Sequence, residues 1–525
     1  MRYDVFSEWL HGRAVRVVLG LVVLSLAVRC PDSVAQESVF RLAGDARLVT
    51  ESDEDGYFAD SSAFGTQLSA LAEDEAGAVS LAEALEPPKV PGLSSESDPL
   101  VRDLARRLAD VESQLQARDK ADQQKADAAA KKFAVRPFGR VHIDTGTFNQ
   151  DQANKETVGE ARNGVDIRRA RLGVEGEGFD IFFYRFDVDF VTSDTGSNAS
   201  LASGKRPTVF DAYVDTMQLP LFGNIRVGNF REPISLDRLE STNDMPFLER
   251  ANPVNALTPF RNIGVMAFDW NAAETRTIAY GLFAENTNEY GEYYRDRPGV
   301  AITARTTWLP WTEQCGDDLN LVHLGLGYSF RHCSVRQAQF GTTPEFGIRQ
   351  DFIGGLMQTP RFVNTPTIAM QDYHLFSLEF ATDLGPFSLQ SEYLMLSGNQ
   401  IDNPHLFFHG GYIEAMYHLT GEHRSYNRKQ GIHSPLRLNS NFSRKQTEDG
   451  IVTSPGAWEL TGRISTIHLN SENIQGGDLV DLTIGLNWYY APRSRVMINY
   501  IHAFLDRKNL DSNADIVGIR YQWVF

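Results

Sequence analysis

The chain ends in a stretch that alternates polar and apolar side chains, Ala514-Asp515-Ile516-Val517-Gly518-Ile519-Arg520-Tyr521-Gln522-Trp523-Val524-Phe525. Its aromatic rings occupy every second position, at Tyr521, Trp523 and Phe525, so the three rings share one face of an extended strand. Alternation between an apolar face and a polar face is typical of membrane β-barrels, in which side chains point in turn to lipid and to the lumen. This stretch therefore predicts a barrel-forming strand.

The final aromatic residues also suggest a cellular location. A terminal Phe525 preceded by Tyr521 and Trp523 resembles the carboxyl-terminal signal of bacterial outer-membrane proteins. We therefore expect the mature protein to lie in the bacterial outer membrane, in contact with its lipid.

The amino terminus agrees with export. Two arginines precede an apolar run at residues 17–28, and the small-residue site Ser33-Val34-Ala35 follows it, which fits a secretory signal peptide over residues 1–35. The apolar run is shorter than the roughly 18 residues that a transmembrane helix needs. We expect no transmembrane helix in the chain.

The composition limits where a positive field can lie. Hydrophobic residues make up 42% of the 525 residues, and the formal net charge is −18. The low hydrophobic content is compatible with a barrel, because lumen-facing side chains are polar. Since acidic residues predominate, a positive field must be local. We expect no nucleic-acid partner.

The segment before the barrel divides into two parts. Residues 36–97 are acidic, rich in small side chains and weakly periodic, which indicates a flexible linker. Residues 98–132 carry a heptad stripe that predicts a short coiled-coil helix, with a single amphipathic helix as the alternative. The stripe consists of Val101, Leu104, Leu108, Val111 and Leu115.

From residue 135 to residue 525 the pattern has a period of two, which predicts an all-β, transmembrane antiparallel β-barrel of about sixteen strands. Short turns alternate with longer loops, and the short turns of outer-membrane barrels face the periplasm. The expected strands are about 136–148, 165–176, 180–191, 208–219, 224–233, 260–270, 276–286, 297–310, 319–331, 372–383, 386–397, 405–420, 456–470, 478–490, 495–507 and 514–525.

Two connections disturb this alternation. Residues 332–371 leave room for an extra hairpin around 345–353, which leaves the strand count open by two. Residues 421–455 predict a long periplasmic insertion. Its basic side chains are interpreted as a solvated, flexible turn, with a feature of the pore mouth as the alternative. They are Arg424, Arg428, Lys429, Arg437, Arg444 and Lys445.

Tryptophan and cysteine positions provide two further expectations. Every tryptophan after the signal peptide falls at a predicted periplasmic strand end, where interfacial rings form a girdle. They are Trp270, Trp308, Trp311, Trp458, Trp488 and Trp523. Cys315 and Cys333 lie at opposite ends of one predicted strand, farther apart than the roughly 7 Å that a disulfide allows, so we expect no bridge between them.

Strand parity predicts the lumen lining, because Arg or Lys on the lipid face near mid-membrane costs about 2–4 kcal/mol. Rings of arginine or lysine are the expected device of an anion or phosphate pore. The alternative is structural pairing that braces the wall, because lumen carboxylates such as Asp187 and Asp189 accompany the arginines. The pore-lining, anion-binding candidates are Arg140, Arg169, Arg171, Arg185 and Arg226.

A long loop follows the fifth predicted strand. Residues 234–259 exceed an ordinary connection, and such loops are usually functional or disordered. In a barrel wide enough to hold a channel, the loop could fold inward as a constriction. Its charged candidates are Arg238, Glu240, Asp244 and Arg250.

Nothing in the sequence suggests catalysis. His405, His409 and His418 are scattered along one predicted strand, with neither close spacing nor carboxylate neighbours. No Ser/His/Asp set or metal-ligand spacing stands out. We expect no enzyme activity, no cofactor and no metal.

Several segments together resemble the phosphate-selective porin O and P family over residues 135–525. They are residues 166–176, 226–236, 456–463, 482–500 and the terminal Phe525. The resemblance implies a sixteen-stranded, trimeric porin whose third loop narrows the pore and whose basic side chains guide anions. Only Arg169 and Arg171 lie in a strand motif that matches well enough to propose them as members of an arginine ladder.

The expected function is therefore an outer-membrane porin. It would form a water-filled channel for diffusion of small hydrophilic solutes, with anion or phosphate preference as the finer expectation. A homotrimer is expected, and the coiled coil could contact the cell wall. The alternative is a non-conducting structural barrel that anchors a periplasmic coiled coil.

Overall fold

The structure, a computed structural model, describes residues 133–192, 206–285, 299–316, 318–333, 336–348, 359–447 and 450–525, with scattered positions between Asp103 and Lys120. The predicted signal peptide and linker lie outside these residues. The scattered positions are helical, and Val111 and Leu115 are about half exposed there. The coiled-coil pairing stays a prediction. In the described part of the chain, no helix is long and apolar enough to cross a membrane.

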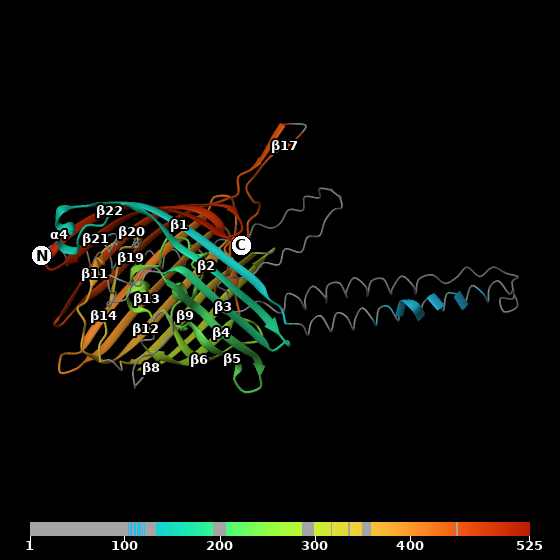
Figure 1. The fold of residues 1–525 in the computed structure, drawn as a ribbon, viewed down its shortest axis with the longest axis horizontal. Coiled ribbons are helices and arrows are strands. Elements are labelled where there is room, and N and C mark those ends of the chain that lie inside the picture. Colours follow the sequence, from blue (N-terminus) through green and yellow to red (C-terminus); the bar gives the residue numbers. More distant parts are fainter. Residues whose placement is uncertain are drawn as a thin grey trace.

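Sixteen antiparallel strands close into one barrel, in which each strand pairs with the next and β22 pairs with β1 (Figure 1). The predicted strands are all present, with shifts of a few residues at their ends. The strands are β1 (Arg136–Gln150), β2 (Gly164–Gly178), β3 (Phe182–Thr192), β4 (Arg206–Leu219), β5 (Gly223–Arg231), β6 (Arg261–Trp270), β7 (Arg276–Glu285), β8 (Gly299–Cys315), β9 (Asp318–His332), β12 (Met370–Leu384), β13 (Phe387–Gln400), β14 (Leu406–His418), β19 (Ala457–Ser471), β20 (Ile474–Ala491), β21 (Ser494–Arg507) and β22 (Leu510–Val524).

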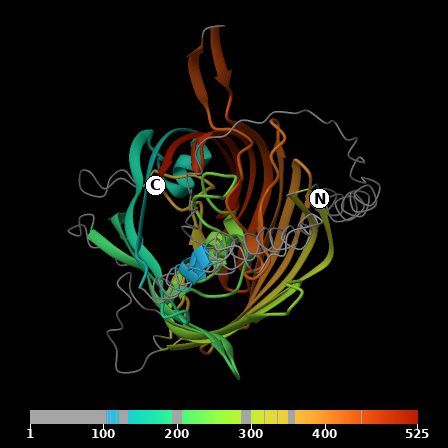
Figure 2. The same cartoon turned by 90° about the vertical axis from the view of Figure 1, so that its right-hand side faces the viewer.

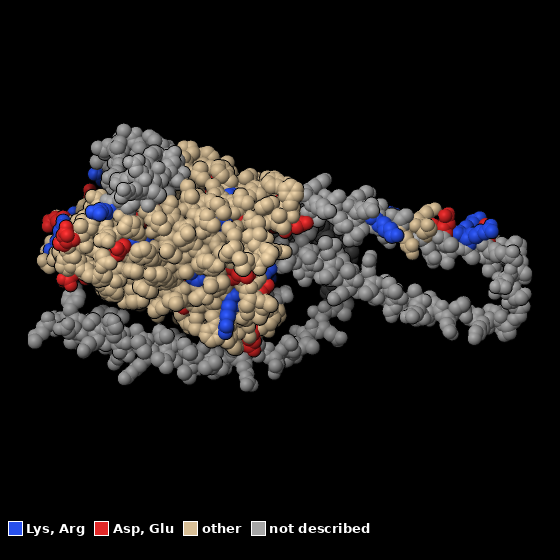
Figure 3. All heavy atoms as spheres, turned by 90° about the horizontal axis from the view of Figure 1, so that it is seen from below, with Lys and Arg blue, Asp and Glu red and all other residues tan. Residues whose placement is uncertain are grey.

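The alternation predicted for the last strand is present in β22. Tyr521 and Trp523 are 47% and 46% exposed on the outside, whereas Arg520 and Gln522 are fully buried. On the face in Figure 3, few charged atoms lie in the middle of the barrel wall, and most gather toward its two ends. The outer surface therefore has the apolar band that a lipid-facing barrel requires.

Most short turns and the carboxyl terminus lie at one end of the barrel, which is the periplasmic end by the rule for outer-membrane barrels. The six tryptophans are near this end of their strands. Helix α4 (Gln152–Val158) follows β1 at the other end, and Asp151 caps it by accepting a hydrogen bond from the Asn154 amide.

A β-bulge interrupts the pairing of β1 with β2. His142 pairs with Arg169 and Ile143 pairs with Ile167, so Arg168 is an extra residue on β2. Both Arg168 and Arg169 are buried as a result. Strict alternation would have turned Arg168 toward lipid.

Three segments fold into the lumen. The inner loop (residues 232–260) contains the short helices α5 (Leu236–Leu239) and α6 (Asn252–Leu257). The outer segment (residues 336–348) enters from the extracellular end, and the periplasmic insertion (residues 419–442) enters from the periplasmic end. Figure 2, a view onto the periplasmic end, shows chain inside the ring of strands.

The connection between β9 and β12 differs from the expected hairpin around 345–353. Residues 345–348 are not in a strand, and the remainder of that range lies outside the described residues. A small two-stranded sheet forms instead from β10 (Gly341–Thr342) and β11 (Val363–Asn364), and it does not join the barrel. The barrel therefore keeps sixteen strands.

The interpretation of the basic residues around Arg424 as a solvated, flexible turn is wrong for the periplasmic insertion. Arg424 is only 6% exposed, and the insertion carries the short pair β15 (Tyr426–Asn427) and β16 (Ile432–His433). Only the later hairpin, β17 (Ser443–Thr447) with β18 (Gly450–Ser454), projects away from the barrel (Figures 1 and 2).

An apolar core lies inside the extracellular half of the barrel. Residues of α6, together with Phe340, Phe362 and Val363, pack against inward-facing apolar side chains of β12, β13 and β14, so loop and wall bury one another. The inward-facing wall residues include Leu375, Leu394, Leu396 and Phe408. Cys333 lies at the edge of this core as a free, buried thiol.

Candidate pore constriction

The inner loop is anchored to strands other than the two that it connects. The Glu392 carboxylate on β13 accepts hydrogen bonds from the amides of Leu236 (3.1 Å) and Asp237 (2.7 Å) at the start of α5. Backbone and wall also meet closely at Gly327, where any Cβ would clash with the Ile234 carbonyl. These contacts hold the loop across the lumen.

The far part of the inner loop reaches the seam where β22 meets β1. Arg140 donates to Thr242 Oγ1 (2.9 Å) and to Asn243 Oδ1 (3.1 Å) from β1. From β22, Gln522 donates to the Asn243 carbonyl (2.8 Å). One loop residue is therefore bonded to both strands of the seam.

A cluster of arginines surrounds Glu249 of the inner loop. The Glu249 carboxylate lies 2.7 Å from Arg168 Nη2, 3.5 Å from Arg169 Nη2 and 3.2 Å from Arg520 Nη2. Arg520 also holds Asp144 through two hydrogen bonds of 2.7 Å. We call this set the Glu249 cluster: Arg168, Arg169, Arg520, Asp144 and Glu249.

The other predicted arginines of the wall are paired one to one with carboxylates. Arg171 Nε lies 2.8 Å from Asp189, Arg185 Nη1 lies 3.0 Å from Glu175, and Arg226 binds both oxygens of Asp215 at 2.7 Å. All of these side chains are buried. The Arg226 guanidinium also stacks 3.7 Å from the centre of the Tyr213 ring. This is the geometry expected of wall bracing.

Two predicted loop arginines support the inner loop itself. Arg238 donates to Thr258 Oγ1 and to the Val254 carbonyl, both at 2.6 Å. Arg250 donates to the Asp237 carbonyl (2.7 Å) and to the Glu240 carbonyl (2.5 Å). Burial lowers the pKa of Arg238 to about 10.

The two predicted loop acids point to other elements. Asp244 lies 3.4 Å from Arg493, in the turn between β20 and β21. Glu240 contacts the periplasmic insertion, 3.0 Å from Arg424 and 2.6 Å from His433. Burial acts to raise the pKa of Glu240, but Arg424 and His433 outweigh it and hold that pKa below its ordinary value.

Several buried charges were not among the sequence candidates. Arg520 shares the inward parity of its strand and could have been identified from the alternation in β22. Arg463 lies in residues 456–463, one of the segments in which the sequence resembles the porin family, and it binds Glu345 of the outer segment at 2.7 Å. Arg168 was missed because of the bulge. The remaining inward-facing arginines are Arg231, Arg261, Arg305, Arg331 and Arg495.

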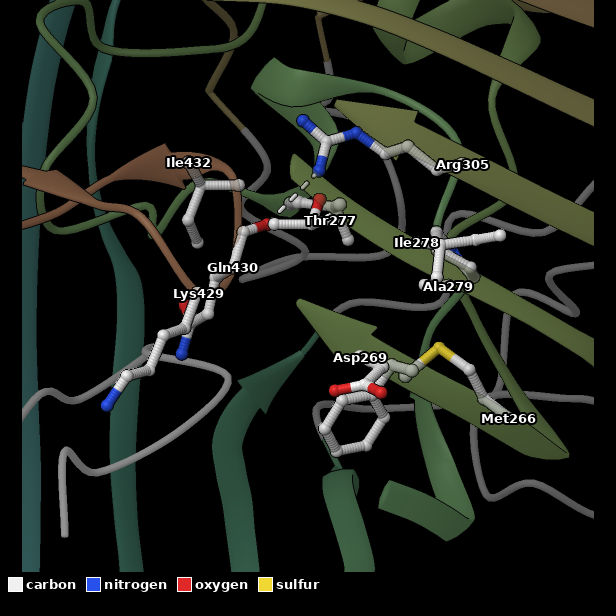
Figure 4. A pocket seen from close by; sticks show the side chains of 12 residues that line it. Met266, Asp269, Thr277, Ile278, Ala279, Arg305, Lys429, Gln430 and Ile432 are labelled. Atoms are coloured by element: carbon white, nitrogen blue, oxygen red, sulfur yellow. Dashed lines mark hydrogen bonds between the residues drawn. The ribbon is translucent and has the colours of Figure 1, made fainter. Parts of the chain in front are cut away.

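A small cavity of about 40 Å³, partly open to solvent, lies where the inner loop and the periplasmic insertion meet the wall (Figure 4). Leu239 and Ile432 line it from the two segments, and Met266 and Phe268 line it from β6. Arg305 donates to backbone carbonyls at its edge. The inner loop and the insertion thus bound a common space.

Among the described residues, no group of three or more His, Cys, Asp or Glu side chains could hold a metal ion. His405 and His409 face outward, and His418 is buried 3.5 Å from Glu459, so it does have a carboxylate neighbour. No local pattern could predict that contact, because the two residues meet only through the pairing of β14 with β19.

Comparisons with known proteins agree with this architecture. Residues 135–525 match the family model described as phosphate-selective porin O and P. Porin O of Pseudomonas aeruginosa is 23% identical over 435 residues, covering 75% of this chain and 89% of the relative. An uncharacterized protein of Caulobacter vibrioides is 24% identical over 374 residues, covering 69% and 67% of the two chains.

Solved porins also resemble the chain in structure. An anion-selective porin from Comamonas acidovorans aligns with a TM-score of 0.43 at 14% identity, over 75% of this chain and all of that one. The outer-membrane channel DcaP of Acinetobacter baumannii aligns with a TM-score of 0.45 at 10% identity, over 75% and 97% of the two chains.

Proposed function

The chain belongs to the phosphate-selective porin O and P family, so it is a non-enzymatic, channel-forming porin of the bacterial outer membrane, and we propose that its channel prefers small anions such as phosphate. In this proposal small hydrophilic solutes diffuse past the inner loop. Ion transport of this kind requires neither a cofactor nor an energy source.

The observation that carries the proposal is the Glu249 cluster. Its three arginines face two carboxylates, so positive charge is in excess where the inner loop meets the wall. Guanidinium groups stay charged at any relevant pH and match phosphate oxygens in pairs. The predicted residues Arg171, Arg185 and Arg226 are each paired with a carboxylate, so they contribute less to the electrostatic field along the path of a diffusing anion.

Arg169 is the residue best suited to contact a passing anion. Its contacts are long, 3.4 Å from Nη1 to His142 Nδ1 and 3.5 Å from Nη2 to Glu249. A loosely held guanidinium can exchange these contacts for a phosphate oxygen at little cost. Conduction needs such moderate binding, because a tightly held anion would not leave the pore.

The test is Arg169→Gln, measured in planar bilayers under a KCl gradient with added phosphate. One charge-assisted hydrogen bond is worth about 1.5–3 kcal/mol. We therefore expect phosphate block to weaken about tenfold or more and the reversal potential to move toward cations.

The matched control is the double variant Arg226→Gln with Asp215→Asn. It removes one positive and one negative buried charge from the same wall, and it should leave the selectivity of the parent protein. If Arg169→Gln behaves like this control, or if the parent shows no anion preference, the arginine proposal is wrong while the porin assignment stands.

A second candidate role for this porin is to anchor the amino-terminal segment, with a conductance too low to be useful. The occupied lumen favours it, because the inner loop, outer segment and periplasmic insertion all contribute buried residues there. Stepwise conductance would exclude this candidate. Reproducible silence of correctly folded protein would support it.

We further propose a homotrimer, with residues 98–132 as a coiled coil that reinforces it or contacts the cell wall. The half-exposed Val111 and Leu115 would find apolar partners in such an assembly. Deleting residues 36–132 and measuring the oligomer by size-exclusion chromatography with light scattering tests this. Unchanged trimers would leave the coiled coil without an assembly role.

A further inference from the structure

The periplasmic insertion and the inner loop enter the lumen from opposite ends of the barrel and meet at Glu240. Arg424 lies 3.0 Å from one oxygen of Glu240, and His433 Nδ1 lies 2.6 Å from the other. The second ring nitrogen of His433 lies 3.1 Å from Asp383 on β12. One histidine therefore joins the inner loop, the insertion and the wall.

Further contacts fasten the insertion to the wall on either side of this junction. Arg424 donates to Gln390 on β13 (2.9 Å), and Arg305 on β8 donates to the Gly431 carbonyl (2.8 Å). The Tyr426 hydroxyl lies 2.6 Å from His323 on β9. Figure 4 shows Arg305 of the wall and Gln430 and Ile432 of the insertion among the side chains that line the cavity.

Apolar contact between the two segments is small by comparison. Ile432 of the insertion packs with Leu236 and Leu239 of the inner loop and with Ala381 of β12. The junction is therefore held mainly by charged and polar groups, which respond to pH, and not by a large apolar surface that would be insensitive to it.

We propose that the periplasmic insertion is a latch that closes over the inner loop through Glu240, Arg424 and His433, and that its release widens the periplasmic half of the channel. This inference rests on the proposed porin function for its effect on conductance. Whether residues 419–442 stay in contact with the inner loop can be tested without measuring conductance.

The charges around the junction determine how it responds to pH. Burial and Arg424 act to lower the pKa of His433, but Asp383 and Glu240 outweigh them and raise it. The pKa of Glu240 is lowered, as described above. The titratable and charged groups that face these two side chains are Asp237, Arg250, His323, Asp383, Glu414, Arg424 and Tyr426.

The two shifted pKa values determine how the stability of the closed latch changes with pH. The pKa of His433 is raised when the latch is closed. Protonated His433 therefore stabilises the closed latch fully below the ordinary pKa of 6.5, and this stabilisation is lost as pH rises through the raised pKa. The pKa of Glu240 is lowered. Ionised Glu240 therefore stabilises the closed latch fully above its ordinary pKa of 4.5, and this stabilisation is lost as pH falls through the lowered pKa. The latch is therefore most stable between these limits and opens on both sides.

The first experiment measures single-channel conductance of the full-length protein across this range. Parent protein should conduct least at intermediate pH and more at both extremes. His433→Gln should remove the alkaline change, and Glu240→Gln should remove the acidic change. A difference of one pKa unit between closed and open states changes the latch equilibrium by up to about tenfold. His468→Gln, on the outer face of β19, is the matched control and should keep the parent profile.

A second readout does not depend on conduction. Ile432→Cys places a thiol at a position that is 3% exposed, and its labelling by a charged thiol reagent is followed by peptide mapping, relative to denatured protein at the same pH. Labelling should be slow at intermediate pH and faster at both extremes. Adding His433→Gln should speed labelling at intermediate pH.

These outcomes distinguish the latch proposal from the channel proposal. Labelling that depends on pH as described, in a protein that never conducts, supports the latch and overturns the channel proposal. Labelling that stays slow at every pH, with a flat conductance profile, overturns the latch and leaves the porin intact. Wild-type labelling in the His433→Gln background also overturns it.

Discussion

The buried pair of Arg226 and Asp215 allows a quantitative test of wall bracing. Both side chains are almost fully buried, and two hydrogen bonds of 2.7 Å join them. Removing one partner of a buried pair typically costs about 3–5 kcal/mol, because the other charge stays uncompensated. We therefore expect Asp215→Asn and Arg226→Gln each to lower the free energy of unfolding by about this amount.

The double variant should lose about as much free energy of unfolding as one single variant, because both substitutions remove the same two hydrogen bonds. The expected coupling free energy, which is the sum of the two single losses minus the loss in the double variant, is therefore about 3–5 kcal/mol. Arg226→Gln should be the more damaging single change, by about 1 kcal/mol, because it also removes the cation–π contact with Tyr213.

The assay is urea unfolding of the four proteins in detergent micelles, followed by tryptophan fluorescence at one pH and salt concentration. The cycle compares the loss in the double variant with the sum of the two single losses. Additive losses would show that the two side chains are not coupled, and the description of this wall as a set of paired charges would be refuted.

Three further predictions concern other parts of the lumen. Glu392→Gln replaces one of the two oxygens that accept from the Leu236 and Asp237 amides with an NH₂ group, so we expect a loss of about 1–3 kcal/mol in unfolding free energy and noisier conductance; an unchanged trace would contradict the anchoring role. Gly146→Ala brings a Cβ into the Phe346 ring, so the outer segment must move, and protease cleavage within it should increase in folded protein. Cys333 is 1% exposed and burial raises its pKa, so a charged maleimide should label it only after denaturation, and rapid labelling of native protein would be inconsistent with its buried position.

The strands could be predicted because their pattern is local. Lipid on one side and a polar lumen on the other impose a period of two on every strand, as in the alternation of β22. Apolar residues on the inner face, such as Leu394 and Leu396, were a readable exception to that pattern. In the structure they pack against the inner loop, which the sequence analysis did not predict.

The candidate site was predicted only in part, because its geometry depends on distant residues. The parity that placed Arg169 inward also turned Arg168 outward, and only the register shift at His142 corrects this. Glu240 and Arg424 are 184 residues apart in sequence. No local pattern identifies such a pair, so the basic residues of the insertion resembled an ordinary surface turn.

The position of Asn243 has a mechanical consequence for the barrel. The seam between β1 and β22 joins strands from far apart in the sequence, and Asn243 binds Arg140 on one side of it and Gln522 on the other. The inner loop therefore acts as an internal staple across the seam. Parting these strands sideways requires breaking the loop contacts as well as the strand ladder, so this wall should resist lateral opening more strongly than its backbone hydrogen bonds alone would allow.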